Sequence, residues 1–147
     1  MMRIAMLLTA ALMAGSGVAL GAQDASLAMH PKAPAGARVF IVSPKDGATV
    51  GPDVDVRFGA AGIAVKPAGD PTPNSGHHHL LIDVARPPPM DQPIPNDATH
   101  KHYGKGQTQD TIHLSPGTHT LQLDFGNAAH MQFDPRLLSK KITIHVK

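Results

Sequence analysis

Two pairs of histidines with the same spacing are the residues of this chain best suited to chemistry. They are His77-x-His79 and His100-x-His102. Alternate residues of a β-strand point to the same face, roughly 6.5–7 Å apart, so two imidazoles placed in this way can lean toward one cation. The spacing therefore predicts that each pair can act as a bidentate metal ligand.

The first pair lies in a run that is typical of a core strand, Gly76 to Val84. Alternation gives this strand two faces: one carries His78, Leu80, Ile82 and Val84, and the other carries His77, His79, Leu81 and Asp83. The apolar face predicts burial in a core, which leaves the two candidate ligands on the opposite face. A structural alternative stays open, in which His78 is buried and hydrogen-bonded while its two neighbours are solvated.

The second pair lies in a long connection from Arg86 to Gly106. This connection begins with a run of prolines, which cannot donate to a β-ladder and so cannot sit inside a sheet. Loops of this length in compact domains are usually functional or disordered. If the loop folds back on the strand, the two pairs meet, and a later loop adds one more candidate. The predicted ligands are His77, His79, His100, His102 and His130.

The absence of cysteine narrows the kind of metal site. With no thiolate, imidazole nitrogen would dominate, which favours Cu(II), Zn or Ni and excludes a blue-copper centre. Met90 and Met131 lie near these elements and are suited to Cu(I), although methionines are more often packing residues. We expect a copper or zinc ion as the cofactor.

The composition favours an all-β domain. All 11 acidic residues are Asp, and Pro and Gly number 14 each, so helix formers are scarce and turn residues abundant. Strands are expected near residues 38–43, 54–58, 76–84, 107–114, 118–125 and 140–146. Ser115-Pro116-Gly117 predicts a hairpin between two of them. The sequence predicts an antiparallel, immunoglobulin-like β-sandwich of about seven strands with one long Pro-rich loop.

Three other histidines are assigned from the phase of these strands. His119 shares the phase of Leu121 and is expected to point inward. His113 and His145 alternate with apolar neighbours and are expected to face water.

The N-terminus indicates export. Residues 1–22 carry one charge, then an apolar run, then small residues, which is the layout of a secretory signal. Residues 23–37 are expected to form a flexible arm, and residues 38–147 the β-sandwich. The protein is then periplasmic or secreted, with no membrane span after cleavage. An N-terminal copper ligand at His30 fits poorly, because signal peptidase requires a small residue where Met29 stands.

Charge and motifs limit the remaining functions. The 13 basic and 11 acidic residues are spread without a basic run, so a nucleic-acid partner is not expected. No Gly-x-Ser-x-Gly elbow or metallohydrolase spacing occurs, so we do not expect an enzyme. The alternative to metal binding is an envelope module that binds protein or glycan, with the histidines as a structural polar network.

Five motifs in order resemble a known bacterial exported family. They are residues 76–83, 91–95, 100–108, 116–123 and 127–130, within a resemblance that runs from Phe40 to Val146. The family is known only as domain of unknown function 4399, so the resemblance implies an exported domain but no activity. In the family pattern a second His follows three positions after the one matched by His130. This chain has Phe133 there.

Overall fold

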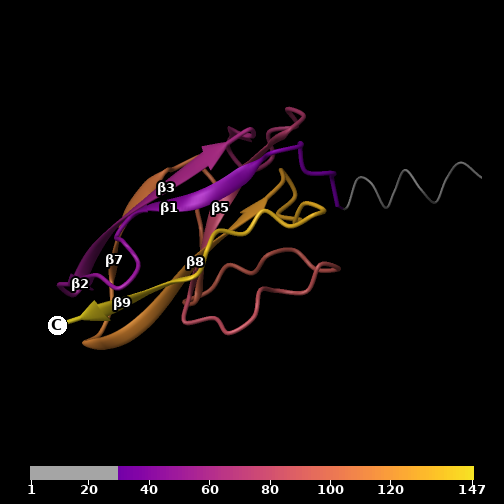
Figure 1. Cartoon of the computed structure of the whole chain (residues 1–147). Coiled ribbons are helices and arrows are strands. Elements are labelled where there is room, and N and C mark those ends of the chain that lie inside the picture. Colours follow the sequence, from indigo (N-terminus) through magenta and orange to yellow (C-terminus); the bar gives the residue numbers. More distant parts are fainter. Residues whose placement is uncertain (1–29) are drawn as a thin grey trace, which may run out of the picture.

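The computed structural model describes residues 30–147, which form two β-sheets and no helix (Figure 1). The predicted signal segment 1–22 lies outside the described residues. The strands are β1 (Arg38–Ser43), β2 (Thr49–Val50), β3 (Asp53–Ala61), β4 (Ala64–Val65), β5 (Ser75–Ile82), β6 (His100–His102), β7 (Gln109–His113), β8 (Gly117–Gly126) and β9 (Ile142–Val146).

The two sheets enclose one hydrophobic core. The smaller sheet has the order β1-β3-β7, and the larger has the order β2-β9-β8-β5-β4, with β6 also paired to β5. Alternating apolar residues of both sheets fill the space between them, including Val54, Val56, Phe58, Leu80, Leu121, Leu123, Phe125 and Ile144. The predicted all-β sandwich is confirmed; its immunoglobulin-like topology stays a prediction.

Strand β5 is buried along its whole length. Its inner face packs into the core, and the Pro-rich loop lies on the outer face of its sheet (Figure 1). This loop contributes the buried side chain of Ile94, and the amide of Gln132 ties it down by donating to the carbonyls of Pro88 and Pro89. Both faces of β5 are therefore buried, whereas an antiparallel sheet commonly has one face in contact with solvent.

The predicted hairpin around Ser115-Pro116-Gly117 is wrong in its pairing. Strand β7 pairs with β3 in the smaller sheet, whereas β8 pairs with β5 and β9 in the larger one. The turn residues carry the chain from one sheet to the other. A turn signal fixes where the chain bends, but the partner of each strand is set by the packing of the whole domain.

The elements differ from the prediction in several places. The short strands β2 and β4 were not predicted, and β3 continues to Ala61. Strand β5 ends at Ile82 because Asp83 has a left-handed backbone (φ 57°), so the strand does not reach Val84. The long loop is interrupted by β6, which pairs with β5.

The described part of the predicted arm, residues 30–37, contacts the domain. Lys32 forms a parallel bridge with Asp134, and the side chain of Ala33 is buried in the core. Contacts with the sandwich thus begin before residue 38. Within residues 30–147 no helix has the length and apolar character needed to cross a membrane.

Candidate metal centre

Strand β5 places His77 and His79 on its outer face, as the alternation predicts. Both side chains are fully buried, and their ring centroids are 4.8 Å apart. On β8 the residue opposite His77 is Gly126. A Cβ atom there would stand 3.2 Å from Cε1 of His79, so the glycine leaves room for that ring.

Strand β6 brings the third imidazole. His102 pairs with His79 across the β5–β6 ladder, so the two side chains share the outer face. The next residue, Tyr103, anchors the strand from the other side: its ring packs on Phe58 at 4.7 Å and its hydroxyl donates to Asp110. Because alternate residues point to opposite faces, the buried tyrosine helps to hold His102 against β5.

A tight turn after β8 delivers His130. Its backbone is left-handed (φ 64°), a conformation that is uncommon for residues other than glycine. The side-chain oxygen of Asn127 accepts hydrogen bonds from the backbone N–H groups of Ala129 and Met131, each at 2.9 Å. The carbonyl of His130 in turn accepts from the N–H of Ile94, which docks the Pro-rich loop on the turn. The unusual backbone of His130 is thus fixed from several sides.

The four imidazoles converge. Nε2 of His102 lies 3.2 Å from Nε2 of His77 and 3.1 Å from Nε2 of His130. One nitrogen from each of His77, His79 and His102 can be chosen so that all three lie within 4.8 Å of one another. Around a tetrahedral Zn with Zn–N distances of about 2.0–2.1 Å, neighbouring ligand nitrogens are roughly 3.3 Å apart. We name His77, His79, His102 and His130 the histidine cluster.

Hydrogen bonding alone does not account for these contacts. An imidazole nitrogen carries either a proton or one lone pair, so Nε2 of His102 can form only one good hydrogen bond, yet it faces two nitrogens. Both ring nitrogens of His79 lack a hydrogen-bond partner among residues 30–147. Buried polar atoms without partners are costly and call for an explanation. A cation shared by the rings would satisfy them.

The surroundings favour the neutral form of three rings of the cluster, those of His77, His79 and His102. Burial, reinforced by the neighbouring imidazoles, lowers the pKa of His77 to about 4 and that of His79 to about 2. Burial and His130 also lower the pKa of His102. A neutral imidazole is the form that binds metals, so His77 and His79 do not have to lose protons at pH 7 before they bind an ion.

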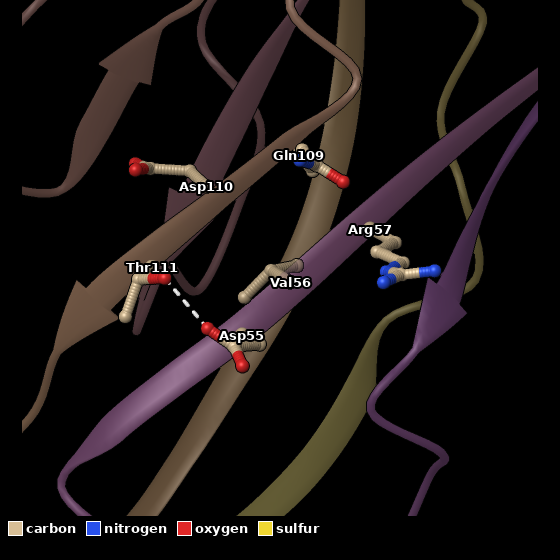
Figure 2. A pocket seen from close by; sticks show the side chains of 6 residues that line it. All are labelled: Asp55, Val56, Arg57, Gln109, Asp110 and Thr111. Atoms are coloured by element: carbon tan, nitrogen blue, oxygen red, sulfur yellow. Dashed lines mark hydrogen bonds between the residues drawn. The ribbon is translucent and has the colours of Figure 1, made fainter.

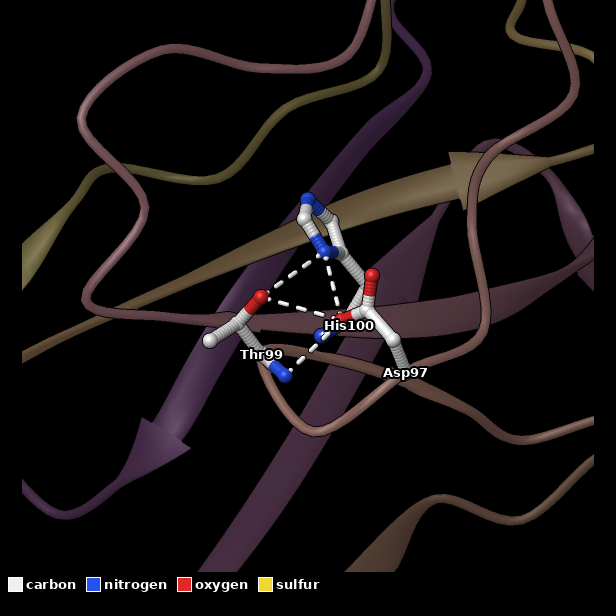
Figure 3. A network of polar contacts seen from close by, with 3 residues as sticks. All are labelled: Asp97, Thr99 and His100. Carbon is white, nitrogen blue, oxygen red and sulfur yellow. Dashed lines mark hydrogen bonds and ion pairs between the residues drawn. The ribbon is translucent and has the colours of Figure 1, made fainter.

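His100 does not join the cluster, although it was predicted as a ligand. It stands opposite Leu81 in the ladder, two residues along the strand from His102. Its Nδ1 lies 2.9 Å from a carboxylate oxygen of Asp97 and 3.0 Å from the hydroxyl of Thr99, in a local network (Figure 3). The spacing of the pair was a correct guide to the face, but the register against β5 places His102 opposite His79 and His100 opposite Leu81, so only His102 reaches the cluster.

The other histidines have separate surroundings. His78 points into the core, with its ring 5.4 Å from that of Phe58 and 5.0 Å from that of Phe125. The structural alternative for residues 76–84 is wrong in two respects: neither ring nitrogen of His78 has a partner among the described residues, and His77 and His79 are buried rather than solvated. His119 lies at the margin of the core, where Nδ1 meets Asp83 at 2.7 Å and Nε2 meets the carbonyl of Ser115. His113 and His145 are exposed, as predicted.

Phe133 stands where the family pattern has a second His. Its side chain is buried in the hydrophobic core, with its ring 6.1 Å from that of Phe125. In this chain the position contributes to packing.

Sequence reasoning missed Asp124. It is fully buried, stands opposite His79 on the β5–β8 ladder, and burial raises the pKa of its carboxyl to about 7. Its alternation with Leu123 and Phe125 indicated a solvent-facing position. The cover over the outer face of β8 comes from distant segments, which the local pattern does not reveal.

A polar groove lies on the other sheet. Asp55 and Arg57 of β3 and Gln109, Asp110 and Thr111 of β7 line it (Figure 2). The hydroxyl of Thr111 donates to Asp55 at 2.6 Å. Asp55, Arg57, Gln109 and Thr111 lie on the polar outer face of this antiparallel pair, as alternation predicts. Asp110 pairs with Val56 and accepts a hydrogen bond from Tyr103, so it belongs to the inner face.

The fold and the cluster together define the class: a two-sheet β-protein in which two buried and two half-buried imidazoles gather at one point. The chain belongs to the family described as domain of unknown function DUF4399, whose model matches residues 56–147. That range contains β5, β6, β8 and the whole histidine cluster. Neither the curated proteins nor the solved structures contain a match to the chain.

Proposed function

We propose that the protein binds one transition-metal ion through His77, His79 and His102, with His130 as the fourth ligand. The observation that carries the proposal is that Nε2 of His102 lies 3.2 Å from Nε2 of His77 and 3.1 Å from Nε2 of His130. His79 lies beside them with no hydrogen-bond partner among residues 30–147. Zn and Cu(II) suit a set of neutral imidazoles.

The cluster suits carriage or buffering of a metal better than catalysis. His77 and His79 are fully buried, whereas His102 and His130 are only partly so, which supports entry of the ion from the side of the latter pair. If all four imidazoles bind, a four-coordinate ion has no open position for a substrate. We therefore infer a carrier or buffer of copper or zinc.

A purely structural polar network is the competing role, and it fits other histidines better. Both ring nitrogens of His119 and Nδ1 of His100 have hydrogen-bond partners. The ring nitrogens of the histidine cluster outnumber the hydrogen-bond partners available to them. The competing role therefore applies to His100 and His119.

Metal stoichiometry tests the proposal. Purified protein is dialysed against Zn(II) and, separately, Cu(II), and the bound metal is counted by mass spectrometry. We expect close to one ion per chain, and almost none in a His77→Leu/His79→Leu variant. The matched control is His113→Leu/His145→Leu, which removes two exposed histidines and should bind as the wild type does. A wild-type stoichiometry below a few tenths, or equal binding by the two double variants, would contradict the proposal.

We further propose that the protein is exported and works in the periplasm or outside the cell. The support is the layout of residues 1–22, a charged start, an apolar run and small residues. Fractionation of the source cells, with sequencing of the mature N-terminus, tests this. Protein that keeps Met1 and stays with the cytoplasmic fraction would refute it.

A further inference from the structure

Among residues 30–147, Asp124 is the only acidic side chain that is fully buried. Neither of its carboxylate oxygens has a hydrogen-bond partner among these residues. The charge of Arg136 acts on it, but the two side chains form no ion pair in the described part of the chain. Burying a carboxylate without a partner is expensive, so its place in the fold calls for a positive charge.

The sheet places this carboxylate beside the histidine cluster. His79 pairs with Asp124 on β8 and with His102 on β6, so the three residues form one row across three strands. They share the outer face, where the Cβ atoms of opposite residues in an antiparallel pair are about 4.5–5.5 Å apart. Asp124 is therefore the acidic group built into the surroundings of the proposed site.

A metal ion bound by the histidine cluster would supply the positive charge that Asp124 lacks. Four neutral imidazoles leave the full charge of a bound ion uncompensated in a dry environment, which is costly. Asp124 would offset one unit of that charge. The attraction of the carboxylate to a divalent ion is twice its attraction to a monovalent ion at the same distance.

We propose that Asp124 is the charge-compensating carboxylate of the histidine cluster and makes the site selective for divalent over monovalent cations. This inference rests on the metal site proposed above. It assigns Asp124 a role outside the ligand set, comparable to the carboxylates that support metal-bound histidines in many sites.

The test compares two ions with the same d¹⁰ configuration and different charge, Zn(II) and Cu(I). The affinity of each is measured by competition with a chelator of known affinity, for wild-type protein and Asp124→Asn. We expect Zn(II) affinity to fall about 10- to 100-fold, as for other outer carboxylates, and Cu(I) affinity to fall about 3- to 10-fold, because the Coulomb contribution is halved. Asp53→Asn, an exposed carboxylate on the smaller sheet, is the matched control and should change neither.

A second measurement separates this role from a structural one. Without metal, loss of a buried and unpartnered carboxylate should leave the melting temperature of Asp124→Asn equal to or above that of the wild type. A lower melting temperature, together with equal losses for both ions, would assign Asp124 to the structure and overturn the inference. Unchanged Zn(II) affinity in Asp124→Asn would overturn it as well.

The outcomes for the two proposals are distinct. Wild-type protein that binds neither ion contradicts the metal site itself, and with it the role of Asp124. Wild-type protein that binds Zn(II) while Asp124→Asn binds equally well contradicts only the role of Asp124. Asp124→Ser, a smaller neutral variant, provides the same comparison if Asp124→Asn does not fold.

Discussion

The two faces of β5 treat the same residue type in opposite ways. His78 on the inner face and His77 and His79 on the outer face are all fully buried. The ring of His78 meets Phe58 and Phe125 of the core. The rings of His77 and His79 meet other imidazoles, with centroids about 5 Å away in His102.

Burial by itself therefore does not determine the function of a histidine in this protein. Burial alone lowers the pKa of His78 to about 4, and burial first and the other imidazoles second do the same to His77. All of these rings are neutral at pH 7. The outer pair differs from His78 in facing further nitrogen donors, so only the outer pair can share a cation.

Acidification should have the largest effect, and it acts on both faces. In metal-free protein the pKa values of His77, His78 and His79 are lowered to about 4, 4 and 2, below the ordinary 6.5. Below pH 6.5 the unfolded chain therefore binds protons that the folded chain does not, and stability falls as the pH falls toward 4. At pH 5 the loss is on the order of 2 kcal/mol per ring.

Urea unfolding of metal-free protein between pH 7.5 and 5 measures this effect. The raised pKa of Asp124, about 7, acts in the opposite direction, so the net loss of stability is smaller than the sum over the three rings. His78→Leu should reduce the pH dependence by the share of one ring and leave metal binding intact. Stability that does not change between pH 7.5 and 5 would show that the buried rings are free to protonate in the folded state.

Single substitutions on the two faces should separate in metal affinity. His79→Leu removes a ligand, and we expect a loss of Zn(II) affinity on the order of 100-fold, since a structural zinc site of four ligands is worth about 10–16 kcal/mol. His78→Leu should stay within about threefold of the wild type, because the ring faces the core. Isothermal titration with a competing chelator measures both. Equal losses in the two variants would remove the distinction between the faces.

A smaller perturbation is available at Gly104. A Cβ atom at this position would stand 2.2 Å from Cε1 of His102, so Gly104→Ala must displace that ring. We expect a loss of Zn(II) affinity of about tenfold or more, with little change in unfolding free energy because the end of a side chain has to move. Gly51→Ala is the control, since nothing lies within 4 Å of the added methyl group. Equal Zn(II) affinity in Gly104→Ala and Gly51→Ala would contradict the assignment of His102 as a ligand.

The smallest effect is expected from Asn127→Ala. The substitution removes the acceptor for two backbone N–H groups that flank His130, which loosens a turn with an uncommon backbone. Zn(II) affinity should fall about 3- to 10-fold, less than when a ring is lost, because His130 can still reach the ion at an entropic cost. Affinity unchanged from the wild type would place His130 outside the ligand set.

Local alternation carried most of what the sequence predicted correctly. The period of two put His77 and His79 on one face and His78 on the other, and the apolar runs gave the two-sheet sandwich. His113 and His145 followed the same rule, because their strands have one face covered and one face in water. These features depend only on neighbours in sequence.

What the sequence did not predict depends on distant segments. The bend at Ser115-Pro116-Gly117 was visible, but its role in joining two sheets depends on which strands pair. His100 and His102 have the same local pattern, and only the ladder to β5 distinguishes them. Asp124 is fully buried on the outer face of β8, where the distant residue Leu138 forms a bridge with it, and no local period reports this.

A crystal grown with Zn(II), and measured at the zinc absorption edge, tests the central claim most directly. The account predicts one anomalous peak per chain, about 2.0–2.1 Å from a ring nitrogen of each of His77, His79 and His102. The nearest nitrogen of His78 should lie on the other side of the sheet. A map with no peak at the histidine cluster, or with the ion held by His100 and Asp97 instead, would contradict it.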